Sequence, residues 1–190
     1  MNLTIPNLLT LLRMGLVPLF IIAVLDGHAA RALVIFVAAG VTDALDGFIA
    51  RFWNQRSLLG AYLDPIADKL LLVSAWVVLS IPSLGTAVRI PLWVTVLVIA
   101  RDVLIVIMAL VFFLATDVRS FPPSLLSKAT TVVQVTTVSM VLGAAVFPRL
   151  VPVAETLVYV VFVFTLLSGL DYTRRTIARL AATKGRVAPG

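Results

Sequence analysis

Long apolar segments, separated by short polar ones, follow one another along the whole chain. Most of them are close to the length of about 20 apolar residues that a helix needs to cross a bilayer. The first is the least continuous, because its uninterrupted apolar part is short and depends on support from residues 5–12. The helices we expect lie at about residues 14–25, 29–48, 66–81, 91–115, 125–147 and 153–170. The pattern therefore predicts an all-α polytopic membrane protein with six transmembrane helices, and residues 1–190 as a single membrane domain.

The composition supports a membrane protein over a soluble one. Hydrophobic residues make up 61% of the chain and charged residues only 13%. Soluble domains have about 45–50% apolar and about 25% charged residues. A soluble fold of this size could not bury so much apolar surface, whereas a bilayer provides an apolar solvent for it.

The basic residues predict the orientation of the helices. If both termini lie on one side, most of the 15 lysine and arginine residues fall on that side, including a basic tail from about 171 to 190. The positive-inside rule then places both termini in the cytoplasm. Nucleic-acid binding is the other interpretation of a net charge of +6. It is disfavoured, because the basic residues flank apolar segments and form no soluble patch.

The chain has no cysteine and a single histidine, His28. Disulfides and zinc sites that need cysteine are therefore excluded. Any metal must be held by oxygen ligands, which favour magnesium, calcium or manganese.

Four aspartates are concentrated between the second and third predicted helices. Asp43 and Asp46 are three residues apart, and Asp64 and Asp68 are four apart, near the expected start of the third helix. Each pair therefore shares one helix face. Four converging carboxylates would repel one another unless cations lay between them. Two Mg²⁺ ions, or Mn²⁺ in their place, would answer that need and could clamp a pyrophosphate.

The residues around the aspartates fit the same chemistry. Gly47, Ala50 and Gly60 leave room for a ligand or a neighbouring backbone. Arg51 and Arg56 could neutralise phosphate charge. The alternative is that these are ordinary charged residues at helix ends in the membrane interface, which explains single positions better than it explains the spacing of all four aspartates.

These positions form the motif D-x2-D-G-x2-A-R-x8-G-x3-D-x3-D, which begins at Asp43 and ends at Asp68 without a departure. The chain thereby resembles the CDP-alcohol phosphotransferase family, and residues 5–13 are similar to that family's opening segment. The resemblance implies a homodimer of six-helix chains, with the active site on the cytoplasmic face and lipid substrates drawn from the membrane. The membrane would be the bacterial inner membrane, or the mitochondrial inner membrane in a eukaryote.

The resemblance also implies roles for single residues. The aspartates of the motif hold two metal ions, and Asp68 acts as general base. Gly47, Ala50, Arg51 and Gly60 line the CDP site. An acceptor hydroxyl attacks the lipid-side phosphorus of a CDP-linked lipid, and CMP leaves.

The acceptor is less sharply indicated. Residues 99–102 and 123–134 are similar to family members that join CDP-diacylglycerol to phosphatidylglycerol and form cardiolipin. Glycerol 3-phosphate is the alternative acceptor. Arg101 and Lys128 are the candidate acceptor-binding residues, because either acceptor carries phosphate. Arg101 could instead form a structural pair with Asp102, and Lys128 could reflect only the positive-inside rule.

Two other protein classes place acidic residues in membranes. A transporter would show inverted repeats and broken helices, and we find no repeat. A membrane prenyltransferase would need aspartate-rich motifs in two separate places, whereas this chain has one cluster.

Overall fold

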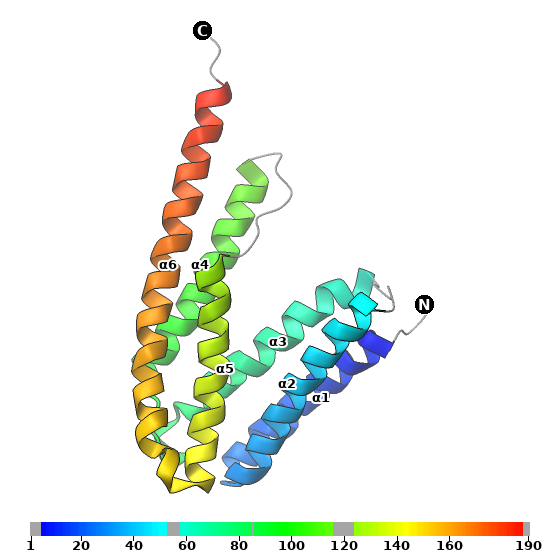
Figure 1. The fold of residues 1–190 in the computed structure, drawn as a ribbon, viewed down its shortest axis with the longest axis vertical. Coiled ribbons are helices and arrows are strands. Elements are labelled where there is room, and N and C mark those ends of the chain that lie inside the picture. The colour runs from blue at the N-terminus through cyan, green and yellow to red at the C-terminus, as the bar shows by residue number, and fades with distance from the viewer. Residues whose placement is uncertain (1–4, 53–57, 85, 116–123, 188–190) are drawn as a thin grey trace. The chain divides into compact units, whose positions relative to one another are not determined.

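The computed structural model describes residues 5–52, 58–84, 86–115 and 124–187, and the side chains of a smaller set within them: 8–43, 66–82, 84, 86–108, 110 and 124–178. The described chain is all helical and contains no strand, which confirms the predicted class for that part (Figure 1). The helices are α1 (Ile5–Leu25), α2 (Ala29–Phe52), α3 (Leu58–Leu79), α4 (Leu92–Ala115), α5 (Leu125–Val146) and α6 (Val151–Val187), with short 3-10 turns at Pro82–Leu84 and Pro148–Leu150.

The helix boundaries differ from the expected ones at the polar ends. Helix α3 begins at Leu58 and not at 66, so the position of Asp68 lies well inside the helix. Helix α2 continues to Phe52, and α6 continues to Val187 through the basic tail. Apolarity marks the part of a helix that lipid can surround, whereas backbone hydrogen bonds decide where the helix itself ends.

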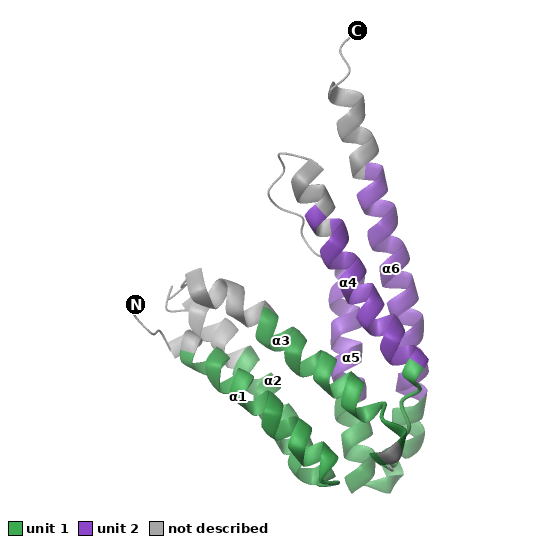
Figure 2. Cartoon of the chain, turned by 180° about the vertical axis from the view of Figure 1, so that it is seen from behind, with its two compact units in different colours: residues 1–92, 138–155 green, residues 93–137, 156–190 purple. Residues whose placement is uncertain are grey.

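The chain divides into two compact units (Figure 2). Unit 1 comprises Met1–Leu92 and Val138–Glu155, and unit 2 comprises Trp93–Thr137 and Thr156–Gly190. Helices α1, α2 and α3 therefore belong to unit 1, while α5 and α6 each contribute residues to both units.

In unit 1, α1 packs against both α2 and α3. Phe20 and Phe36 form a tilted aromatic pair across α1 and α2, with ring centroids 5.7 Å apart, and both side chains are buried. Gly27 turns the chain from α1 into α2 with φ of 74°, a left-handed conformation that costs other residues energy. This turn brings α2 back alongside α1.

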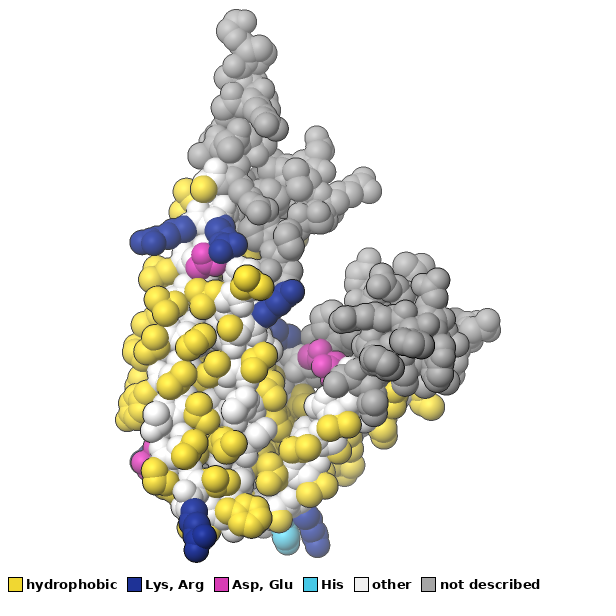
Figure 3. All heavy atoms as spheres, in the orientation of Figure 1, with side chains coloured by type: hydrophobic (Ala, Val, Ile, Leu, Met, Phe, Trp, Pro, Cys, Tyr) yellow, Lys and Arg dark blue, Asp and Glu magenta, His cyan; other side chains and the backbone are white. Residues whose placement is uncertain are grey.

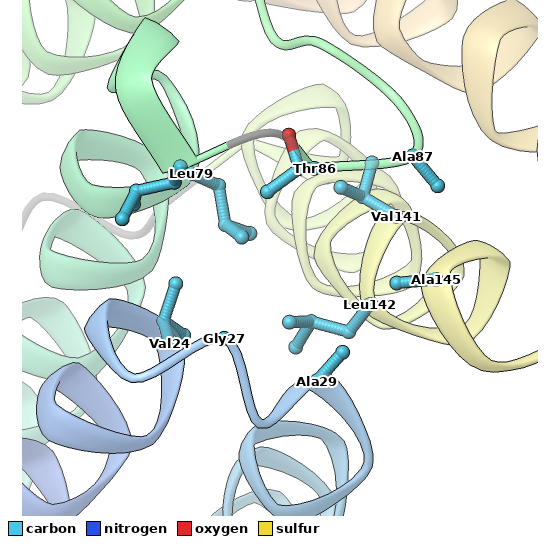
Figure 4. A pocket seen from close by; sticks show the side chains of 10 residues that line it. Val24, Gly27, Ala29, Leu79, Thr86, Ala87, Val141, Leu142 and Ala145 are labelled. Atoms are coloured by element: carbon cyan, nitrogen blue, oxygen red, sulfur yellow. The ribbon is translucent and has the colours of Figure 1, made fainter.

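A cavity of about 280 Å³ lies beside this turn, within unit 1 (Figure 4). Its walls are mainly apolar and include Val24, Leu79 and Leu142. Val24 and Leu79 lie roughly 16 Å along their helices from Arg13 and Asp68, at about 1.5 Å per residue. The cavity is therefore separate from the acidic positions.

In unit 2, hydroxyl groups of α5 lie near carbonyls of α6. The Thr130 hydroxyl is 2.8 Å from the Leu126 carbonyl of its own helix and 3.3 Å from that of Phe164. Thr137 repeats the arrangement with the Leu157 carbonyl, at 3.5 Å. Such contacts satisfy hydroxyls that have no water to bond inside a bilayer.

Much of the described surface is apolar, as the yellow side chains in Figure 3 show. Within the described residues, three segments are long and apolar enough to cross a bilayer: Leu8–Leu25, Leu125–Val146 and Pro148–Ala178. Exposed Val34, Val37 and Leu167 would be costly in water and suit contact with lipid. The protein is thus a helical membrane protein.

Candidate functional site

Two aspartates of the motif have described side chains, and both contact one arginine. Nη1 of Arg13 lies 3.1 Å from Oδ1 of Asp43 and donates a hydrogen bond to Oδ1 of Asp68. The Arg13 side chain is 1% exposed, whereas those of Asp43 and Asp68 are 45% and 43% exposed. The guanidinium therefore lies on the buried side of the pair, and the carboxylates are accessible.

The packing of three helices creates this cluster. Arg13 is on α1, Asp43 on α2 and Asp68 on α3, and α1 packs against both of the others. An unpaired arginine within an apolar span costs at least about 2.5 kcal/mol. Two carboxylates compensate that cost, and the arginine in turn relieves the repulsion between them.

Arg13 is a site residue that the sequence interpretation missed. The sequence interpretation placed Arg13 at the end of the family's opening segment and among the cytoplasmic basic residues, with no role in the acidic site. The available signal was that it interrupts an otherwise apolar segment, since an ionisable residue inside a span has a functional or structural partner by default.

The two carboxylates have the chemistry of divalent-cation ligands, but the described residues contain no group of three or more acidic or histidine side chains that could hold an ion. Carboxylate oxygens from two different helices meet at a single positively charged nitrogen. Carboxylate oxygens are also the ligands that Mg²⁺ and Mn²⁺ prefer. Among the described residues, Asp43 and Asp68 are the members of the predicted set that could take part.

The remaining members of the predicted acidic and CDP site lie outside what the structure describes. Arg56 falls in residues 53–57. For the others the helix runs through the position but the side chain is not described; these are Asp46, Gly47, Ala50, Arg51, Gly60 and Asp64.

The predicted acceptor residue Arg101 lies in unit 2, on α4, and is 6% exposed. Its Nη1 donates to Oδ1 of Asp102 at 2.8 Å. Its Nη2 donates to the hydroxyl of Ser127 at 2.8 Å and to that of Ser168. Helices α4, α5 and α6 thus meet at this guanidinium, and its bond to Asp102 is the pair named above as the alternative to acceptor binding.

The guanidinium of Arg101 retains one unused hydrogen-bond donor. Its Nε is buried and has no hydrogen-bond partner. Gly169 on α6 lies beside this side chain, since an added Cβ there would be in ordinary contact with Cγ of Arg101, at 3.8 Å. Lys128, the other predicted acceptor residue, follows Ser127 on α5 and is exposed. An exposed lysine is available to a ligand but is not held in one position.

Comparison with known proteins gives consistent matches. The model of the family described as CDP-alcohol phosphatidyltransferase matches residues 3–171. The chain is 39% identical over 162 residues to "Cardiolipin synthase (CMP-forming)" of Homo sapiens, covering 76% of this chain and 52% of that protein. The rat protein of the same name is equally similar, with 51% of its length covered. The chain therefore spans about half the length of these curated relatives.

A relative with a different name is similar over more of its length. "Probable phosphatidylglycerophosphate synthase" of Mycobacterium tuberculosis is 35% identical over 180 residues. That match covers 90% of this chain and 80% of the relative.

Proposed function

The chain belongs to the CDP-alcohol phosphatidyltransferase family, and on that premise we propose that it makes a phospholipid from CDP-diacylglycerol. The proposed reaction joins CDP-diacylglycerol to phosphatidylglycerol and yields cardiolipin and CMP. The observation that carries the proposal is the meeting of Asp43 and Asp68, the first and last aspartates of the family motif, at one point between two helices.

The family is generally metal-dependent. We propose that Asp43, Asp46, Asp64 and Asp68 hold two Mg²⁺ ions, or Mn²⁺ ions. Bound there, the ions would neutralise charge on the pyrophosphate and on its leaving oxygen. Support comes from the oxygen chemistry of the motif and from the accessible Asp43 and Asp68 carboxylates.

The protein's own residues would bind the donor and move the proton. Arg51 and Arg56 pair with the phosphates, while Gly47, Ala50 and Gly60 leave room for the CDP group. Asp68 takes the proton of the acceptor hydroxyl. The hydroxyl oxygen forms a bond to the lipid-side phosphorus as the bond from that phosphorus to the CMP oxygen breaks. Positioning and charge neutralisation supply most of the acceleration, as in phosphoryl transfer generally.

Phosphatidylglycerol is the proposed acceptor, and glycerol 3-phosphate is the alternative. The similarity to human cardiolipin synthase favours the first. Similarity over most of the length of the mycobacterial phosphatidylglycerophosphate synthase relative favours the second.

Glycerol 3-phosphate carries nearly two negative charges and needs several basic groups. We propose Arg101 and Lys128 as acceptor-binding residues. The bonds that Arg101 makes to Asp102, Ser127 and Ser168 leave it less free to neutralise a doubly charged ligand.

We further propose that all six helices span the membrane, with both termini and the acidic site on the cytoplasmic side. The distribution of basic residues supports this orientation. A homodimer is proposed on the family resemblance alone.

The test is CMP release by purified protein in detergent, with CDP-diacylglycerol, Mg²⁺, and either phosphatidylglycerol or glycerol 3-phosphate. We expect release with phosphatidylglycerol, loss of release with EDTA, and recovery with Mg²⁺ or Mn²⁺. Release with glycerol 3-phosphate alone would overturn the acceptor and retain the family reaction. The absence of release with either acceptor would contradict the proposed activity.

A further inference from the structure

Arg13 has no part in the reaction proposed above, although it is among the most deeply buried large side chains described. It lies within Leu8–Leu25, a segment apolar enough to span the membrane. One nitrogen of its guanidinium reaches Asp43 on α2 and Asp68 on α3. A buried arginine that joins two motif aspartates from two helices requires a more specific explanation than the positive-inside rule.

The exposure of the three side chains indicates the geometry of the site. The guanidinium is inaccessible, and each carboxylate is nearly half exposed. A cation from solution would therefore approach the carboxylates from the side opposite Arg13. In that arrangement the arginine and the cation contact the same two carboxylates from different directions.

We propose that Arg13 is a positioning residue that holds the Asp43 and Asp68 carboxylates together for a shared divalent cation. The inference rests on the proposed function, in which these aspartates are metal ligands. Groups that hydrogen-bond to metal ligands fix their orientation, and losing one such group commonly weakens metal affinity by about 10-fold to 100-fold. Without Arg13, the two carboxylates would repel each other and lose their fixed separation.

A competing arrangement makes the opposite prediction. If Arg13 occupied the place of the cation, the metal would have to displace it, and removing Arg13 would increase metal affinity. The direction of the change in affinity therefore separates a positioning residue from a competing charge.

The experiment measures Mn²⁺ binding by electron paramagnetic resonance, on purified protein in detergent without lipid substrate. The proteins are wild type, Arg13→Gln, Arg13→Lys, Asp43→Asn and the control Arg31→Gln. Arg31 is an exposed arginine on α2, roughly 18 Å along the helix from Asp43 at about 1.5 Å per residue. Size-exclusion chromatography and circular dichroism check that each variant is folded.

We expect Arg13→Gln to bind Mn²⁺ at least tenfold more weakly than wild type, and Arg31→Gln to match wild type. Arg13→Lys should lie between them, because an ammonium retains the charge but lacks the planar fork of the guanidinium. If Arg13→Gln does not fold, Arg13→Lys carries the test with the same sign. Unchanged or tighter binding in the folded Arg13 variants would overturn the proposal.

The same data distinguish this inference from the proposed function. If wild type binds no more Mn²⁺ than Asp43→Asn does, the assignment of metal to these aspartates fails, and the role of Arg13 fails with it. If wild type binds Mn²⁺ through Asp43 and the Arg13 variants bind it equally well, only the role of Arg13 is overturned.

Discussion

At the scale of single residues, the buried charges are the informative ones. Arg13 and Arg101 are each nearly inaccessible, and each is bonded to an aspartate. The sequence indicated a role for Arg101, but it did not distinguish a ligand-binding arginine from a paired one. It gave no role to Arg13. An unpaired charge among apolar groups is costly, so each of these arginines needs an acidic partner. The role of the arginine therefore depends on which aspartate it contacts.

The proposed general base makes a prediction at this scale. Asp68→Asn should leave the protein folded and reduce the rate of CMP release at least tenfold, because an amide cannot accept the acceptor proton or replace a carboxylate ligand. The measurement is the initial rate with CDP-diacylglycerol, phosphatidylglycerol and saturating Mg²⁺.

The matched control is Asp26→Asn, since Asp26 is an exposed aspartate next to the α1–α2 turn and outside the motif. It should retain the wild-type rate. An Asp68→Asn protein that keeps more than about a tenth of the activity would rule out Asp68 as the base, since general bases contribute roughly 10²-fold or more.

At the scale of elements, the turn between α1 and α2 sets the register of the cluster. Arg13 precedes this turn and Asp43 follows it, so α2 must fold back closely along α1 for the two to meet. Gly27 permits that reversal through its positive φ. Later in the chain, the hydroxyls of Thr130 and Thr137 on α5 lie 3.3 and 3.5 Å from carbonyls of α6, which shows that these two helices lie side by side.

Replacing the turn glycine tests this account. Gly27→Ala should destabilise the protein by about 1 kcal/mol, because a Cβ is unfavourable at positive φ. No atom lies within 4 Å of the added Cβ, so the penalty would come from the backbone alone. The measurement is the thermal unfolding midpoint in detergent, where we expect a decrease of roughly 2–4 °C.

Gly40→Ala provides the comparison, because Gly40 lies inside α2 and an added Cβ there also meets nothing within 4 Å. It should raise the midpoint by roughly 2–4 °C, since alanine favours helix over glycine by about 1 kcal/mol. Equal effects of the two substitutions would refute a role for the conformation of Gly27.

At the scale of the whole molecule, the chain is a helical membrane protein of the CDP-alcohol phosphatidyltransferase family. The described residues form two compact units, one containing the Arg13 cluster and the other the Arg101 cluster. The proposal of six spans and cytoplasmic termini is a statement about how this molecule lies in a bilayer, and the single membrane domain over residues 1–190 stays a prediction.

The absence of cysteine makes the proposed topology directly testable. Single cysteines at His28 and Ala188 should react with a membrane-impermeant maleimide from opposite sides, because helices α1 to α6 would place the α1–α2 turn outside and the C-terminal end inside. His28→Cys should be labelled in intact cells, and Ala188→Cys only after permeabilisation. The reverse pattern, or labelling of both in intact cells, would contradict the orientation.

The sequence by itself determined the helical membrane class, the family motif and the expectation of an oxygen-ligand metal site. Apolar length and carboxylate spacing are local properties, and they can be recognised without knowledge of the fold. The sequence placed the start of α3 too late, because an apolar pattern does not extend over the polar residues of the first turns of that helix.

Only the tertiary structure brought Arg13 to Asp43 and Asp68, and Arg101 to Ser127 and Ser168. These residues are far apart along the chain, and their meeting depends on how helices pack within each unit. Since the compensation of a buried charge is a property of three-dimensional neighbours, the linear pattern identified the charges, and the packing of the helices decided what each one contacts.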